Sequence, residues 1–115
     1  MSNQNPLVDI ELISEMLYQD EKYIKEFAGA SMQSFSEFRE QFRKYVLARD
    51  MEELRRAGHK IKPAALMLNL NVIIDIYEES KTLIEEDAPD AKLHGVADRM
   101  DAYCNQILDE FSNIV

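Results

Sequence analysis

The sequence predicts an all-α protein, an antiparallel up-down four-helix bundle with a short additional N-terminal helix. Glycine and proline, which interrupt helices most often, occur only three times each among 115 residues. Apolar residues recur every three or four positions, as on one face of a helix, and no strand-like alternation persists. The segments between the periodic stretches are short, which favours antiparallel neighbours.

The first two expected helices differ in length. A short helix is expected from Leu7 to Tyr18, where it would pack across one end of the bundle. Asp20 is the expected N-cap of a long second helix, because an aspartate side chain can satisfy free amides of the first turn. The apolar face of this second helix contains Tyr23, Ile24, Phe27, Ser31, Phe35, Phe38, Phe42 and Tyr45.

The third helix is expected after a turn at residues 48–50. Asp50 is its predicted N-cap, with Glu53 as the reciprocal partner in a capping box. Asn69 is expected to end it, because asparagine is second only to glycine in the left-handed conformation that closes helices. The apolar stripe of this helix consists of Met51, Leu54, Gly58, Ile61, Ala65 and Leu68.

Two further helices complete the predicted bundle. The fourth is expected over residues 71–85, and a turn follows at residues 86–90. Pro89 suits the first turn of the last helix, which should continue to Phe111. The residues expected to face the core are Val72, Ile73, Ile76, Ser80, Leu83 and Ile84 in the fourth helix, and Leu93, Val96, Met100, Tyr103, Cys104, Ile107 and Phe111 in the last.

Length and charge limit the class of protein. A chain of this length corresponds to one domain, here residues 1–115. The net charge of −9 argues against nucleic acid as the main partner, because phosphate binding needs a basic surface. The lone cysteine, Cys104, favours a reducing compartment. No signal-peptide pattern and no apolar run of about 20 residues is present, so a cytoplasmic protein without a membrane partner is expected.

One stretch of this acidic chain is basic, and it surrounds a histidine. No acidic residue occurs between Leu54 and Ile74. At about 100° per residue, His59 lies nearly opposite the apolar stripe of the third helix. The residues beside it are Arg55, Arg56, Lys62, Pro63 and Leu66. An exposed neutral imidazole with cations around it suits a phosphoryl acceptor, because the imidazole is nucleophilic and the cations offset phosphoryl charge. An ordinary solvated face is the competing interpretation.

The residues around this histidine resemble a known motif. His59-Lys60-Ile61-Lys62, then Pro63, then Met67-Leu68-Asn69, is similar to the motif of the histidine-containing phosphotransfer (HPt) domain family. That motif reads roughly A-H-x-[LI]-K-[GP]-S, followed by L-G. The order and lengths of the expected helices extend the resemblance over most of the chain. Pro63 stands where glycine is commoner, although a proline variant also belongs to the pattern. Gly58 stands where alanine is commoner, and Ala64 lacks the hydroxyl frequent at its place.

The resemblance implies a phosphoryl carrier of a two-component phosphorelay. His59 would accept the group from a receiver-domain aspartate and pass it to another receiver aspartate, and Lys62 would stabilise its charge. The partners would be response-regulator receiver domains and a hybrid histidine kinase, and the receiver would supply Mg²⁺. The carrier itself would need no cofactor or metal. The expected partner-binding residues are Arg55, Arg56, Pro63 and Leu66.

Other interpretations are weaker. The three glycines are too far apart to form a phosphate-binding loop, so no ATP site or autokinase activity is expected. No acid–base pair or oriented nucleophile indicates another enzyme. Cys104 is expected to be an inert core thiol and His94 an ordinary helix residue. The alternative function is a helical interaction module that binds a receiver or another signalling partner without accepting phosphate.

Overall fold

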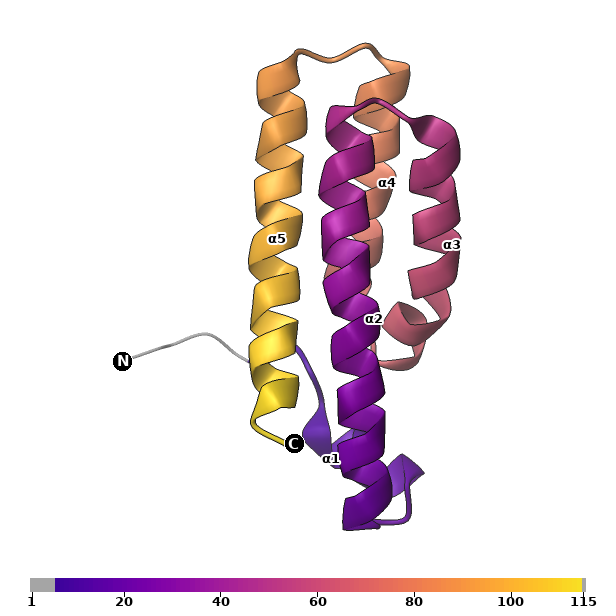
Figure 1. The fold of residues 1–115 in the computed structure, drawn as a ribbon, viewed down its shortest axis with the longest axis vertical. Coiled ribbons are helices and arrows are strands. Elements are labelled where there is room, and N and C mark those ends of the chain that lie inside the picture. The colour runs from indigo at the N-terminus through magenta and orange to yellow at the C-terminus, as the bar shows by residue number, and fades with distance from the viewer. Residues whose placement is uncertain (1–5, 115) are drawn as a thin grey trace, which may run out of the picture.

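The described part of the chain consists of helices joined by short connections. A computed structural model describes residues 6–114 (Figure 1), and within them there is no strand. This confirms the all-helical prediction. The helices are α1 (Ile10–Met16), α2 (Glu21–Leu47), α3 (Met51–Met67), α4 (Asn71–Glu85) and α5 (Asp90–Ser112).

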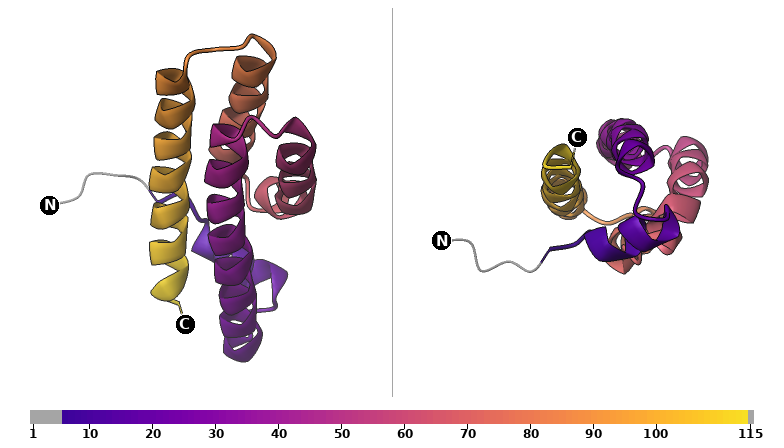
Figure 2. Two further views of the ribbon diagram at one scale, coloured as in Figure 1. Left: turned by 45° about the horizontal axis from the view of Figure 1, so that its top comes forward. Right: turned by 90° about the horizontal axis from the view of Figure 1, so that it is seen from below.

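The four longer helices pack against one another in pairs. The helix α2 packs against α3 and α5, and α4 packs against the same two helices. The end-on view in Figure 2 shows these four helices around a common centre, with α1 lying across one end. The short helix α1 contacts α2. A partly buried Glu110 of α5 holds the segment before α1, because its carboxylate accepts the amides of Leu7 at 3.0 Å and Val8 at 2.7 Å.

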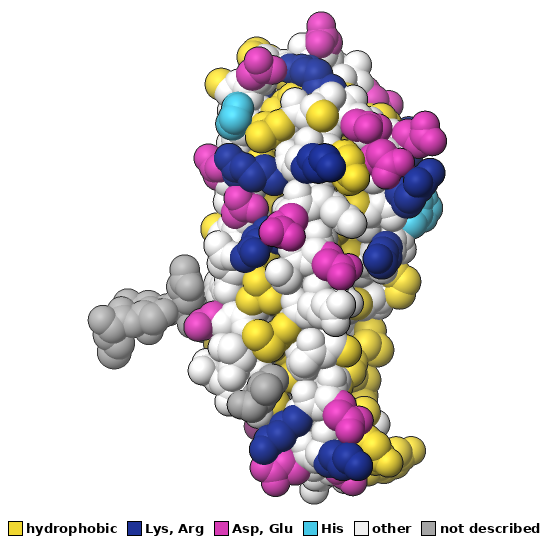
Figure 3. Space-filling view, in the orientation of Figure 1, with side chains coloured by type: hydrophobic (Ala, Val, Ile, Leu, Met, Phe, Trp, Pro, Cys, Tyr) yellow, Lys and Arg dark blue, Asp and Glu magenta, His cyan; other side chains and the backbone are white. Residues whose placement is uncertain are grey.

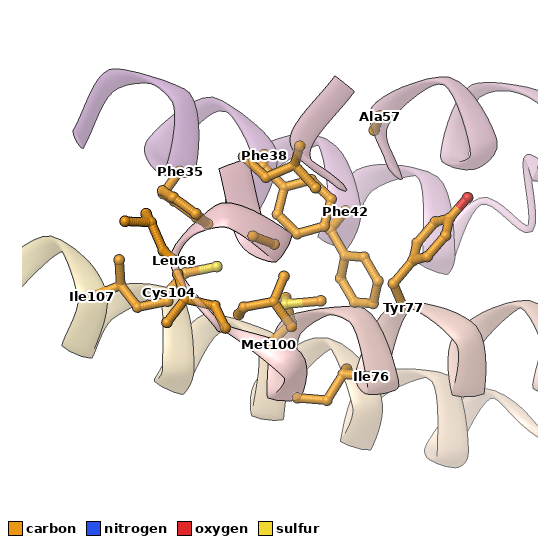
Figure 4. Close-up of a cluster of buried hydrophobic side chains, with 14 of the residues drawn as sticks. Phe35, Phe38, Phe42, Ala57, Leu68, Ile76, Tyr77, Met100, Cys104 and Ile107 are labelled. Atoms are coloured by element: carbon orange, nitrogen blue, oxygen red, sulfur yellow. The ribbon is translucent and has the colours of Figure 1, made fainter. Parts of the chain in front are cut away.

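The core is aromatic and aliphatic, and its members come from every helix. Figure 4 shows part of it, where Phe35 and Phe42 of α2 face Met100 and Cys104 of α5. Burial raises the pKa of the Cys104 thiol to about 12, so the thiol stays protonated and unreactive at neutral pH. Within the described part of the chain, no helix has the length and apolar character needed to cross a bilayer.

Most of the predicted apolar faces are confirmed, with one residue placed wrongly. Phe35, Phe38 and Phe42 are buried, but Tyr23 is 55% exposed. The reason is length: α2 has 27 residues, whereas α3 and α4 have 17 and 15. The first turns of α2 therefore extend beyond these two neighbours, as Figure 1 shows. The predicted helix over residues 7–18 is also too long, because α1 begins only after its N-cap, Asp9.

The helix ends follow the predicted capping chemistry in part. The Asp20 carboxylate accepts the amides of Lys22 and Tyr23, and that of Asp50 accepts the amide of Glu53. The capping box at Asp50 is only half formed, since the Asp50 amide donates to the Tyr45 carbonyl. Pro89 is the N-cap of α5, one residue before the predicted first turn.

Two loops at one end of the bundle are joined by an arginine. Arg49, in the loop between α2 and α3, donates to the Ala88 carbonyl and pairs with Asp87 at 3.3 Å and Asp90 at 3.0 Å. Asp87 and Ala88 belong to the connection between α4 and α5, and Asp90 is the first residue of α5. The contact ties the start of α3 to the start of α5, so the end of the bundle nearest to Asp50 is held by side chains from both connections.

Candidate functional site on the outer face of α3

The helix α3 buries one face and presents His59 on the other. The residues on the buried face are Leu54, Ala57, Gly58, Ile61 and Ala65, whereas His59, Lys62 and Pro63 are exposed. At about 100° per residue this burial pattern leaves the His59 ring directed away from the core. The predicted site residues on α3 are therefore brought to one accessible face of a packed helix.

The C-terminal end of α3 is closed by Asn69. This residue has φ of 57°, in the left-handed region, as the sequence predicts. Its amide donates to the Leu66 carbonyl at 3.2 Å, and the Leu70 amide donates to the Ala65 carbonyl at 2.8 Å. These two bonds form a Schellman motif, which stops the helix and satisfies its last carbonyls.

The cations around His59 differ in their partners. Arg56 pairs with Glu53 at 3.1 Å and Glu52 at 3.7 Å, both on its own helix. Lys60 points toward α2, where its Nζ lies 3.6 Å from a Glu37 oxygen.

Two other cations of α3 do not take part in such ion pairs. Within residues 6–114, neither Arg55 nor Lys62 forms an ion pair, and both are exposed. On the helix, Arg55 precedes His59 by one turn and Lys62 follows it by almost one turn. These two side chains supply the positive charge that is free to act on a bound anion at the His59 face.

Apolar surface continues from the site toward the end of α3. Leu66 is 52% exposed and Met67 is 45% exposed, and Pro63 presents no long side chain. In Figure 3, which views the molecule from the side of α2 and α5, acidic and basic groups interleave over the upper half. Apolar groups gather on the right edge from about the level at which Figure 1 shows the end of α3 down to the level of α1. Ala64 is half-buried and packs against the core.

A contact that sequence reasoning missed lies directly beneath the site. The Tyr77 ring of α4 packs on Gly58, the residue before His59: a Cβ built on Gly58 would lie 2.1 Å from the Tyr77 Cζ. Tyr77 is 7% exposed, and burial, the leading cause, raises the pKa of its hydroxyl. Gly58 in the apolar stripe was a signal for close packing, but the spacing of residues did not show which side chain would fill the gap.

No other part of the described chain forms a comparable site. No group of three or more His, Cys, Asp or Glu side chains within residues 6–114 is placed to hold a metal ion. His94 is exposed on α5. A shallow groove between α2 and α5 contains Arg39, Arg43 and Asp101, but Arg43 is already paired with Asp101 at 2.8 Å and with Asp98 at 2.9 Å.

The chain was also compared with known proteins. Protein-family models, curated proteins and solved structures give no match to it.

Proposed function

We propose that this chain is a histidine phosphotransfer protein of a two-component phosphorelay, with His59 as the phosphoryl acceptor. The observation that carries the proposal is the exposed His59 imidazole on a packed helix, with Arg55 and Lys62 on either side of it, two cations that form no ion pair with any described residue. The resemblance of this segment to the HPt motif supports the same function. A cytoplasmic location belongs to the proposal, because receiver domains are its partners.

The proposed reaction is a reversible group transfer. A lone pair of a neutral His59 ring nitrogen attacks the phosphorus of a receiver aspartyl phosphate. The new N–P bond forms as the P–O bond to the aspartate breaks, and the carboxylate leaves with the bonding electrons. Transfer to a second receiver runs the same step in reverse. Such a transfer depends mainly on alignment and on charge stabilisation, which Lys62 would provide to the phosphoryl oxygens.

The proposal includes an antiparallel up-down order for α2 to α5. The connections between successive helices are short, at residues 48–50, 68–70 and 86–89. Successive helices also contact each other, since α2 packs on α3, α3 on α4 and α4 on α5. Short connections between helices in contact favour antiparallel neighbours.

A second candidate is an interaction module that binds a receiver without accepting phosphate. The exposed apolar side chains of Leu66 and Met67 favour it, because such surface beside charged groups is typical of protein contacts. This surface supports docking equally well with or without transfer. The two candidates differ only in whether a covalent phosphohistidine forms.

The test is phosphotransfer from receiver domains of the same organism. Each receiver is phosphorylated in the presence of Mg²⁺ with a radiolabelled small-molecule phosphodonor such as acetyl phosphate, freed of the phosphodonor and mixed with the chain. We expect the label to move to the chain and to be labile in acid and stable in base, as a phosphohistidine is. A complex with a receiver but no label transfer from any of them would favour the interaction module.

Lys62 should act on the phosphoryl group and Arg55 on the encounter. We expect Lys62→Ala to lower the transfer rate about tenfold at saturating receiver, because removal of one charge contact in a transition state has effects of this order or larger. Arg55→Ala should mainly raise the receiver concentration needed for half-maximal rate, most strongly at low salt, where charge steering is least screened. The measurement is single-turnover transfer against receiver concentration.

The neighbouring cations provide controls for this comparison. Lys60→Ala should change neither the maximal transfer rate nor the receiver concentration for half-maximal rate by more than about twofold, because Lys60 points toward Glu37 of α2. Arg56→Ala should weaken the encounter less than Arg55→Ala, since Arg56 is paired with Glu53. Equal loss of maximal rate in all these variants would remove the special role of Lys62.

Leu66→Glu should weaken receiver binding. Leu66 lies almost two turns from His59 on the exposed side, and a carboxylate there would have to be desolvated in the contact. We expect the dissociation constant, measured by titration calorimetry, to rise at least tenfold, equivalent to about 1.4 kcal/mol. Tyr23→Glu is the matched control, because Tyr23 is 55% exposed against 52% for Leu66 but lies on α2. Similar losses in both variants would mean that the docking surface is misplaced.

A further inference from the structure

The α3 backbone lies close to a side chain of α4 at the residue before His59. A Cβ on Gly58 would lie 2.3 Å from Cε1 and 2.5 Å from the hydroxyl oxygen of Tyr77, in addition to the Cζ contact. Real Cβ atoms essentially never come so close to other heavy atoms, so the ring occupies the space that any other residue would need. About 10 Å³ of free space remains beside this contact, between Gly58, Ile61, Ile73 and Tyr77.

The Tyr77 ring is held in place from its own helix. The Lys81 Nζ lies 4.7 Å from the ring centroid, a cation–π distance. The same Nζ pairs with a Glu78 oxygen at 3.0 Å. Figure 4 shows the ring at the edge of the core cluster, with its hydroxyl end directed away from Met100. The ring therefore has little freedom to turn away from Gly58.

The helix α3 needs outside support at this point. Pro63 lies inside the helix and has no amide hydrogen, so the His59 carbonyl lacks the donor that an ordinary residue four positions later would supply. The turn that carries His59 is thus held by one fewer backbone hydrogen bond. The rigid ring contact at Gly58 lies on the same turn, on the face opposite the solvent.

We propose that Tyr77 is a positioning residue for His59. It acts through the Gly58 backbone and sets how α3 is rotated about its axis and how closely α3 packs on α4 at the acceptor. The inference rests on the proposed function for its consequence in transfer. Displacement of a reacting group by about 1 Å can cost about 100-fold in rate, so a ring that sets the helix position influences transfer without touching the phosphoryl group.

The experiment compares two substitutions of Tyr77. Tyr77→Leu removes the flat ring, and Tyr77→Phe keeps it. We expect Tyr77→Leu to lower the maximal transfer rate about tenfold while the receiver concentration for half-maximal rate stays within about twofold. Tyr77→Phe should retain the rate within about twofold. In the chain alone, the NMR resonances of the His59 imidazole should shift in Tyr77→Leu and stay in place in Tyr77→Phe.

Loss of stability is controlled by a substitution elsewhere in the core. Phe111 of α5 is 0% exposed, so Phe111→Leu truncates a buried ring that does not touch Gly58. It should leave both the transfer rate and the His59 resonances unchanged. Should Tyr77→Leu not fold, Tyr77→Met replaces it, since methionine is closer in volume and adapts to irregular gaps.

The outcomes separate this inference from the proposed function. The positioning role would be overturned if Tyr77→Leu kept the wild-type transfer rate and left the His59 resonances in place. It would also be overturned if Phe111→Leu lowered the transfer rate as much as Tyr77→Leu does. Absence of label in the wild-type chain with every receiver would overturn the proposed function. In that case the imidazole resonances of the chain alone would still decide whether Tyr77 positions His59.

Discussion

The His59→Gln protein is expected to accept no phosphoryl group from a receiver that labels the parent chain. Glutamine keeps the side chain polar and forms helices well, but it has no nucleophilic nitrogen. Because His59 is exposed and outside the core, the free energy of unfolding should change by no more than about 0.5 kcal/mol. Transfer assays with matched thermal unfolding curves measure both effects on the same preparation.

The chain offers its own control for this substitution. His94 is the second of its two histidines and is also exposed, on α5. His94→Gln should be labelled at the wild-type rate and to the same extent. Retention of label in His59→Gln, or its loss in His94→Gln, would place the acceptor elsewhere and remove the basis of the proposed function.

Gly58→Ala is expected to destabilise the fold, although alanine favours helices over glycine. The gain in helix propensity is up to about 1 kcal/mol. The added methyl group opposes this gain, because it would lie 2.1 Å from the Tyr77 Cζ and would force the ring or the helix to move. Overpacking of this kind costs about 1–3 kcal/mol. We expect a net loss of up to about 2 kcal/mol in the free energy of unfolding from urea titration.

The same substitution at the other two glycines is the matched control for Gly58→Ala. Gly29 of α2 and Gly95 of α5 have open space where a Cβ would be placed. Both are exposed in helix interiors. Gly29→Ala and Gly95→Ala should therefore each raise the free energy of unfolding by about 0.5–1 kcal/mol. If Gly58→Ala raised the free energy of unfolding by the same amount, the contact with the Tyr77 ring would not affect stability.

Much of the fold follows from local rules in the sequence. The capping residues Asp20 and Asp50 and the left-handed Asn69 are predictable because each acts on its own helix end within a few residues. Tyr23 shows where local rules fail. The aromatic spacing of α2 continues to its first turn, but burial there depends on how far the neighbouring helices extend.

The candidate site also has some features that local rules predict and others that they do not. The exposure of His59 and Lys62 follows from helix periodicity alone. The ion pair of Lys60 with Glu37 and the ring of Tyr77 against Gly58 do not, because both join residues that are 19 or more positions apart. Such contacts depend on the rotation and separation of two helices, and a single sequence gives no measure of either quantity.

The carboxylate of Glu110 has a consequence for the order of folding. It receives the amides of Leu7 and Val8 across a sequence separation of more than 100 residues. Bringing together groups so far apart costs loop-closure entropy, which nearby contacts avoid. The segment before α1 therefore gains its hydrogen-bond partner only after α5 has joined the bundle. On the ribosome, this segment is made before the helices of the bundle, yet it would be among the last parts of the fold to reach its final contacts.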